Sequence, residues 1–129
     1  MGYIITCSGN REKYFTGDKK EFWSNDLNKV CIFEDKEGTI DIVNHPLLDQ
    51  QIVDETTSVG NVSILYPHPI IEKAVKNSEH SYCTLYVKEI IEGVINNEII
   101  FEKAFNAKTV VTIDGEDCTK DFERWKNNQ

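Results

Sequence analysis

The fold is decided largely by residues 82–105, which read YCTLYVKEIIEGVINNEIIFEKAF. In the first half of this stretch Cys83, Leu85, Val87 and Ile91 are expected to share one face of a strand. A two-residue period of this kind is typical of a strand that buries one face. Isoleucine and valine are frequent throughout, and β-branched residues favour strands. The stretch therefore predicts two long strands that pair as an antiparallel hairpin.

The position of the hairpin turn is predicted from residues that tolerate unusual backbone angles. Asn96-Asn97 is the predicted two-residue turn, because asparagine adopts positive φ more readily than most residues. Gly93 is then expected to form a bulge in the first strand. A helix is the alternative, since four apolar residues also fit helical spacing: Ile90, Ile91, Val94 and Ile95. The glycine and the two asparagines favour the strands.

Further strands are predicted on both sides of the long hairpin. Apolar or alternating runs bounded by turn residues lie at 3–7, 13–17, 30–33, 39–43, 61–66 and 109–113. The first two runs are expected to pair as an N-terminal hairpin. The last is expected to follow the long hairpin as the third strand of a meander, and Asp114-Gly115 is the turn after it. Residues 44–60 are expected to form a long loop, with one short helix at 47–53.

Two helices complete the predicted fold. Pro69 suits the first turn of a helix, and the apolar residues after it share one helical face; they are Ile70, Ile71, Ala74 and Val75. His68 is a candidate cap for this helix, which is expected to end at Asn77-Ser78. Asp117 or Thr119 can cap a final helix that reaches about Lys126 and buries Phe122 and Trp125. The pattern predicts one α+β domain, residues 1–129, with a mainly antiparallel β-sheet and one or two packed helices.

The chain is acidic, and its charge restricts the partners that it can bind directly. It has 129 residues, 14 Lys and Arg against 22 Asp and Glu, and a net charge of −8. Nucleic-acid phosphates and anionic membrane surfaces require positive charge, so direct binding to either is disfavoured. A basic protein partner is favoured through faster association. Simple solubility is the alternative explanation for the charge.

Two stretches carry most of the acidic side chains. Residues 34–55 hold seven acidic residues against one lysine, and residues 114–123 hold five against one. A concentrated acidic surface indicates partner contacts more directly than the total charge does. Trp23, next to Phe22, is a candidate aromatic anchor for a partner, with core packing as the alternative. The predicted binding carboxylates are Glu34, Asp35, Glu37, Asp41, Asp49, Asp54, Glu55, Asp114, Glu116 and Asp117.

The cysteines and histidines lack the spacing of a metal or catalytic site. Cys7, Cys31, Cys83 and Cys118 are too far apart for a zinc pattern, and three of them lie in apolar runs. We expect reduced thiols that pack as small hydrophobic side chains. His45, His68 and His80 show no paired spacing with another ligand. The sequence contains no phosphate-binding glycine loop or nucleophile elbow, so no catalytic residue, metal or cofactor is predicted.

The sequence pattern indicates neither a signal peptide nor a membrane span. The N-terminal residues do not combine a charged segment with a long apolar run, and no stretch approaches the ~20 apolar residues of a membrane span. A cytoplasmic location is therefore expected. The sequence contains nothing that identifies a small-molecule ligand.

The N-terminal third contains a short strand, then KYFTG at 13–17, then WSND at 23–26, then an apolar strand that ends in IF at 32–33. This pattern resembles small uncharacterised proteins of phages and bacterial mobile elements. The resemblance implies an accessory protein in such a context, and it implies no catalytic residues.

The leading functional hypothesis is a non-enzymatic binding protein that inhibits a basic partner stoichiometrically. A nucleic-acid-processing enzyme is the expected kind of partner, and the inhibitor would be a phage anti-defence protein or a toxin immunity protein. One alternative is a small enzyme or ligand-binding protein whose pocket combines His45 or His68 with a carboxylate. The other is a structural or assembly component.

Overall fold

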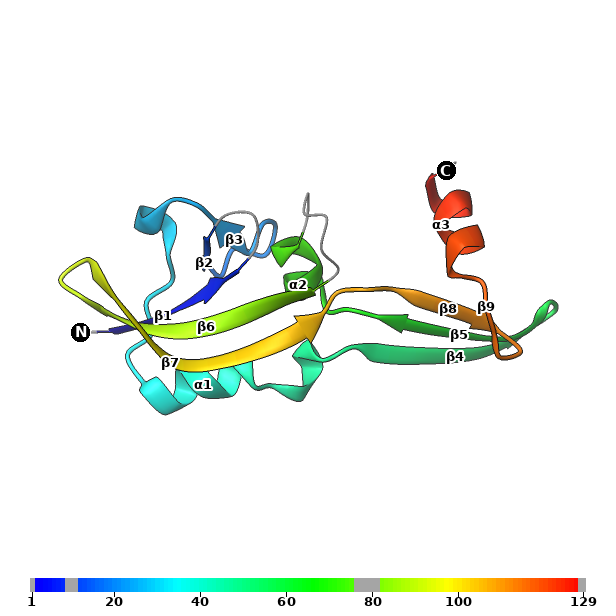
Figure 1. Cartoon of the computed structure of the whole chain (residues 1–129), viewed down its shortest axis with the longest axis horizontal. Coiled ribbons are helices and arrows are strands. Elements are labelled where there is room, and N and C mark those ends of the chain that lie inside the picture. The colour runs from blue at the N-terminus through cyan, green and yellow to red at the C-terminus, as the bar shows by residue number, and fades with distance from the viewer. Residues whose placement is uncertain (1, 9–11, 76–81, 128–129) are drawn as a thin grey trace.

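Two antiparallel β-sheets follow one another along the long axis of an elongated molecule (Figure 1). The computed structural model describes residues 2–8, 12–75 and 82–127. The core sheet has the strand order β3-β2-β1-β6-β7, and the second sheet has the order β4-β5-β8-β9. With a few helices added to mostly antiparallel strands, the predicted α+β class is confirmed.

The core sheet consists of β1 (Gly2–Cys7), β2 (Lys13–Phe15), β3 (Trp23–Ser24), β6 (Tyr82–Ile91) and β7 (Val94–Asn106). The second sheet consists of β4 (Gln51–Thr57), β5 (Gly60–Tyr66), β8 (Val110–Ile113) and β9 (Glu116–Asp117). The helices are α1 (Lys36–Val43), α2 (Pro69–Ala74) and α3 (Thr119–Asn127), with 3₁₀ turns at Leu27–Lys29 and Pro46–Leu48.

The β6–β7 hairpin predicted from residues 82–105 is present, but its turn lies earlier in the chain than expected. Ile91 pairs with Val94, so Glu92-Gly93 forms the turn. Both turn residues have positive φ, 50° and 78°, which matches the twist of a two-residue hairpin loop. Glycine adopts this angle without strain, and so the turn lies at Gly93. The predicted turn at Asn96-Asn97 and the bulge at Gly93 are therefore wrong.

The hydrophobic core lies on one face of the core sheet. Ile5 and Cys7 of β1 and Leu85 and Val87 of β6 point into it, and they are almost completely buried. The helices close this core from the same side, because Val43 of α1 and Ile71 of α2 belong to the same buried cluster. Each side chain of this size stabilises the fold by about 1.5–3 kcal/mol on full burial.

Residues 39–43 form the end of α1, so the strand predicted there is wrong. Asp35 caps the helix: its carboxylate accepts a hydrogen bond from Gly38 N at 3.0 Å. Thr39 and Val43 are the buried residues of the helix, and their spacing of four is helical. The helix buries only a narrow face. Apolar and polar residues can therefore alternate around Ile40 and Ile42 as they would in a half-buried strand.

Residues 44–60 are not a long loop, and this prediction is also wrong. They contain a 3₁₀ turn at Pro46–Leu48 and the seven residues of β4, with no α-helix at 47–53. β4 pairs with β5 along its whole length, from Gln51 with Tyr66 to Thr57 with Gly60. The β-branched pairs in β4 are typical of a strand, and the long-range ladder confirms it.

The remaining strand predictions divide between confirmed and corrected. The N-terminal hairpin is confirmed, since Thr6 of β1 pairs with Tyr14 of β2. β5 and the turn at Asp114-Gly115 are present as predicted. β8 exists but pairs with β5, so the predicted meander is wrong. Residues 30–33 form no strand; within the described residues only Phe33 makes an isolated bridge, to Tyr3.

The two predicted helices, α2 and α3, are present, but not all of their predicted details are confirmed. α2 begins at Pro69, and His68 caps it by accepting a hydrogen bond from Ile70 N at 3.1 Å, as predicted. α2 ends at Ala74 with Val75 as its C-cap, earlier than predicted, and Asn77-Ser78 lie outside the described residues. In α3, Trp125 is 59% exposed, so its predicted burial is wrong; the side chain of Phe122 lies outside the described part of the chain.

The cap of α1 gives a test of how this helix is specified. Asp35→Ala removes the acceptor for Gly38 N, and we expect it to lower the free energy of unfolding by about 1 kcal/mol. Asp41→Ala, on the exposed side of the same helix, is the matched control and should change stability by less than about 0.5 kcal/mol. Urea denaturation of the two variants measures both values. Equal stability of the two variants would show that the cap does not specify α1.

Candidate functional site

The second sheet has an apolar face, which we define by the cross-strand row Glu55–Val62–Ile113–Glu116 and the row Val53–Ile64–Val111 beside it. Residues directly opposite each other across a ladder point to the same side of the sheet. The centre of this face is therefore apolar, with a carboxylate at each end of one row. Val111 is buried, whereas Val53 on the outermost strand is exposed. The face is thus open on the β4 side.

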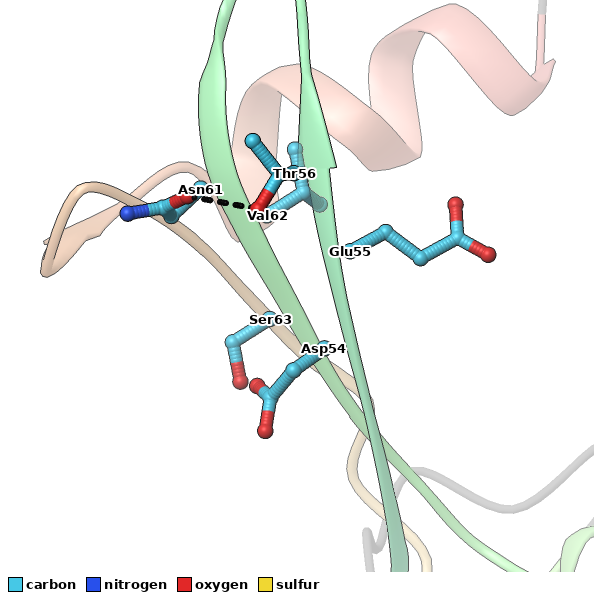
Figure 2. A pocket seen from close by; sticks show the side chains of 6 residues that line it. All are labelled: Asp54, Glu55, Thr56, Asn61, Val62 and Ser63. Carbon is cyan, nitrogen blue, oxygen red and sulfur yellow. Dashed lines mark hydrogen bonds between the residues drawn. The ribbon is translucent and has the colours of Figure 1, made fainter.

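The other side of the sheet is a polar face, made by the row Asp54–Ser63–Thr112–Asp117 and by Thr56 and Asn61. Thr56 Oγ1 donates to Asn61 Oδ1 at 3.1 Å. Figure 2 shows Asp54 and Ser63 on one side of the β4–β5 pair and Glu55 on the other. A pocket of about 290 Å³ is lined by residues of both faces of the β4–β5 pair: Asp54, Glu55, Thr56, Asn61, Val62 and Ser63.

Asp114 ties the tips of the two hairpins of the second sheet together. Its carboxylate accepts a hydrogen bond from Asn61 N at 2.9 Å, and its own N–H donates to Asn61 O at 2.9 Å. Gly60 leaves room for this clasp, because a Cβ at that position would collide with the Asp114 carboxylate. Asp114 therefore maintains the shape of the end of the second sheet, where Glu55 and Glu116 lie.

The structure divides the predicted acidic residues into two separate groups. Glu34, Asp35, Glu37 and Asp41 lie on or just before α1, which packs against the core sheet. Asp54, Glu55, Asp114, Glu116 and Asp117 lie on the second sheet, at the other end of the molecule (Figure 1). The stretch 34–55 is split because α1 ends at Val43 and β4 begins at Gln51.

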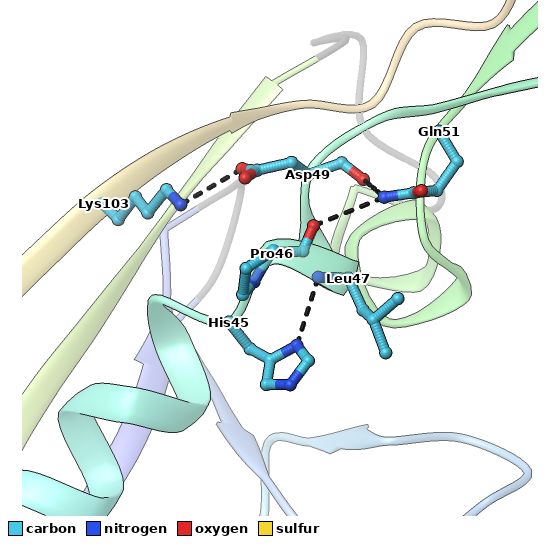
Figure 3. A network of polar contacts seen from close by, with 6 residues as sticks. All are labelled: His45, Pro46, Leu47, Asp49, Gln51 and Lys103. Carbon is cyan, nitrogen blue, oxygen red and sulfur yellow. Dashed lines mark hydrogen bonds and ion pairs between the residues drawn. The ribbon is translucent and has the colours of Figure 1, made fainter.

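Besides Asp114, three more of the predicted binding carboxylates have structural partners. Asp35 caps α1, as described above. Asp49 forms an ion pair with Lys103 at 3.1 Å, shown in Figure 3, so its charge is compensated. Asp117 accepts hydrogen bonds from Thr119 Oγ1 at 2.5 Å and Thr119 N at 2.9 Å, which hold its pKa below the ordinary value. Asp54, Glu55 and Glu116 remain as exposed carboxylates of the second sheet.

Trp23 is a core residue, so its predicted role as a surface anchor is wrong and core packing is confirmed. Only 5% of the residue is exposed. Its Nε1 donates to Ile70 O at 2.8 Å, and its ring meets Phe15 edge to face at 5.6 Å. The large apolar ring thus joins β3 to α2 and satisfies its only donor inside the protein.

The surface that sequence reasoning missed is β4 itself. Ile52 is 62% exposed, and Val53 and Tyr66 are also exposed on this hairpin. The run Ile52-Val53 followed by Thr56-Thr57 was the available signal, since β-branched residues favour strands. The acidic residues and the flanking polar segments concealed it.

The histidines that were candidates for a catalytic pocket act as helix caps. His45 Nδ1 accepts a hydrogen bond from Leu47 N at 3.1 Å, at the start of the 3₁₀ turn in Figure 3. His68 Nδ1 does the same for Ile70 N at 3.1 Å. His80 lies outside the described residues. Within the part of the chain that the structure describes, no three His, Cys, Asp or Glu side chains are grouped to hold a metal ion.

A second hollow, of about 510 Å³, lies beside the start of α3. Its charged lining combines three cations with two carboxylates: Lys108, Lys120, Arg124, Asp117 and Asp121. Charges of opposite sign this close reduce the net field of the hollow. It therefore has less preference for a charged partner than the open carboxylates of the second sheet.

Comparisons of this chain with protein-family models, with curated proteins and with solved structures found no match. No helix among residues 2–8, 12–75 and 82–127 is both long and apolar enough to cross a membrane.

His68 makes the stability of the fold depend on pH. Burial lowers the pKa of His68 from its ordinary value, and its neutral Nδ1 is the acceptor that caps α2. Below about pH 6.5 the unfolded chain takes up a proton that the folded protein resists, so stability falls as the pH decreases toward the folded pKa. His68→Asn keeps a capping acceptor but cannot titrate in this range. Thermal melts between about pH 7.5 and pH 5.5 should show a steeper loss for the wild type. Parallel pH curves for the two proteins would contradict this role.

The buried thiols should be much less reactive than the others. Burial raises the pKa of Cys7 to about 11 and that of Cys83 to about 12, so both stay protonated. Cys31 and Cys118 are only half-buried. Because the thiolate is the reactive form, a thiol reagent at about pH 8 should label Cys31 and Cys118 first. The control is Cys31→Ser/Cys118→Ser, which should stay unlabelled until the protein is denatured. Rapid labelling of this folded variant would refute the prediction.

Proposed function

We propose that this protein is a non-enzymatic binding protein that docks its second sheet onto a basic protein partner and inhibits that partner stoichiometrically. The observation that carries the proposal is the apolar face, where Glu55 and Glu116 stand at the two ends of the row through Val62 and Ile113. An apolar centre with a charged rim is the usual composition of a protein interface.

The two parts of this surface contribute differently to binding. Burial of Val53 and its half-buried neighbours Val62 and Ile64 supplies affinity through the hydrophobic effect. The carboxylates at the rim orient the partner and raise the rate of association with a basic surface. The net charge of −8 acts in the same direction over longer distances.

A basic, nucleic-acid-processing enzyme is the partner that fits this chemistry. The surface with which such an enzyme binds phosphates is positively charged, and it can accept carboxylates in their place. A protein seated there blocks access of the nucleic acid without any catalytic step. The resemblance of the N-terminal third to phage and mobile-element proteins supports two settings for such an inhibitor: phage anti-defence, and immunity to a nuclease toxin.

The first experiment identifies the partner and then tests the surface. Tagged protein captures partners from a bacterial lysate, a salt step releases them, and mass spectrometry identifies them. We expect Glu55→Lys/Glu116→Lys to weaken binding of the recovered partner by about tenfold or more at low salt. The effect should shrink at high salt, because the Debye screening length falls from about 10 Å at 0.1 M salt to about 3 Å at 1 M salt.

The matched control changes the net charge by the same amount on the other acidic group. Glu34→Lys/Asp41→Lys reverses two exposed charges near α1 and leaves the second sheet untouched. It should retain nearly all of the affinity. Equal losses for the two double variants would mean that only total charge matters, and unchanged affinity for both would remove the second sheet as the binding surface.

A further inference from the structure

β4 is the outermost strand of the second sheet, and its outer edge is open. It is the first strand in the order β4-β5-β8-β9, so no strand among the described residues pairs with its other side. Residues 52–57 are all exposed. β4 contains no proline or lysine and its ladder with β5 runs without a register shift, so the charges of Asp54 and Glu55 are its only edge-strand protection.

The hydrogen bonds of the sheet determine which backbone groups point outward. Asp114 N donates to Asn61 O, so the backbone N–H and C=O of Asn61 point toward β8. Backbone groups alternate in direction along a strand, and those of Val62 therefore point toward β4, where they meet Glu55. The outward groups of β4 belong to the alternate residues, Ile52, Asp54 and Thr56. Three N–H and three C=O groups thus stand in a row at the free edge.

The side chains beside this edge favour positive charge in anything that pairs with it. Asp54 lies on the polar face and Glu55 on the apolar face, so both sides of the edge carry a carboxylate. Residues directly opposite in an added strand would lie about 4.5–5.5 Å away, and opposite charges at that distance stabilise pairing. Val53, which is exposed on the apolar face, can contact an apolar side chain of the added strand.

A second copy of this chain is a poorer occupant of the edge. An antiparallel pairing of two β4 strands about their centre places Asp54 opposite Asp54 of the other copy and Val53 opposite its Glu55. A shift by one residue sets Asp54, whose backbone groups point outward, against Glu55, whose groups point toward β5, so this register forms no hydrogen-bonded ladder. Like charges directly opposite each other are destabilising, so full-length pairing of two copies is disfavoured.

We infer that β4 binds an extended, lysine- or arginine-containing segment of a partner protein, which adds to the second sheet as a fifth strand. This inference rests on the proposed function and specifies how the partner is held. Main-chain hydrogen bonds to the outward groups supply affinity, and Asp54 and Glu55 select basic side chains. The apolar face then continues across the added strand.

A short peptide tests this binding mode without the natural partner. The probe is a seven-residue peptide of alternating lysine and valine with blocked ends, which matches the length of β4. Isotope-labelled protein is titrated with it and followed by NMR. Amide exchange should slow at Ile52, Asp54 and Thr56 and change little at Val53 and Glu55, because only the outward N–H groups gain partners. Protection without this alternation, or no binding at millimolar peptide, would overturn the inference.

Variants of the edge separate backbone pairing from side-chain attraction. Ile52→Pro removes one outward N–H and keeps every carboxylate; edge strands tolerate proline where the N–H faces solvent. Ile52→Ala removes the same side chain and keeps the N–H. We expect the proline variant to bind the peptide about tenfold more weakly than the alanine variant, the loss expected for one well-formed hydrogen bond. Equal affinities would contradict strand addition.

The same comparison can be made with the protein unchanged. A peptide of the same sequence with every backbone nitrogen methylated retains its charge but cannot donate hydrogen bonds, and we expect its affinity to fall by at least about tenfold. If it binds as tightly as the parent peptide, strand addition is wrong.

The natural partner separates the two proposals. A recovered partner that is weakened by Glu55→Lys/Glu116→Lys but equally bound by the Ile52 variants keeps the proposed function and overturns strand addition. Dimerisation of the wild type that Ile52→Pro abolishes would make a second copy the occupant and would also overturn it.

Discussion

The pairing of β6 with β1 on one side and β7 on the other is the constraint on which the rest of the structure depends. The ladder with β1 runs from Gly2 opposite Ile90 to Cys7 opposite Leu85, and it brings the start of the chain into the centre of the core sheet. Side chains of β1 and β6 then share one buried face, on which α1 and α2 can pack. Without this ladder the two helices would have no common surface to cover.

The two sheets differ in how they are stabilised, and this difference determines where a partner can bind. Most of the buried apolar side chains of the described residues belong to the core sheet and to the helices packed on it. In the second sheet and the described part of α3, burial is limited to Val111 and Thr119. Hydrogen bonds such as the Asp114 clasp hold this sheet, and its apolar face stays open at β4. A surface with little buried area contributes little to folding and is free for recognition.

The local predictions succeeded where a signal acts over a few residues. Pro69 with His68 before it marked the start of α2, and Asp114-Gly115 marked a turn. The strand at 39–43 failed because the alternation of five residues also fits one and a half turns of helix. The Asp35 cap decides between the two structures, and it lies four residues before that pattern.

The sequence by itself determined the α+β class, the long β6–β7 hairpin and the acidic character of the chain, because these follow from composition and short-range periodicity. Only the tertiary structure decided that β8 pairs with β5, that Trp23 is buried and that the acidic residues form two groups. The physical reason is that backbone hydrogen-bonding groups are the same in every strand. The choice of strand partner therefore depends on which faces can be buried together, and residues distant in sequence settle that choice. The open edge of β4, on which the proposed binding mode rests, is a consequence of that choice.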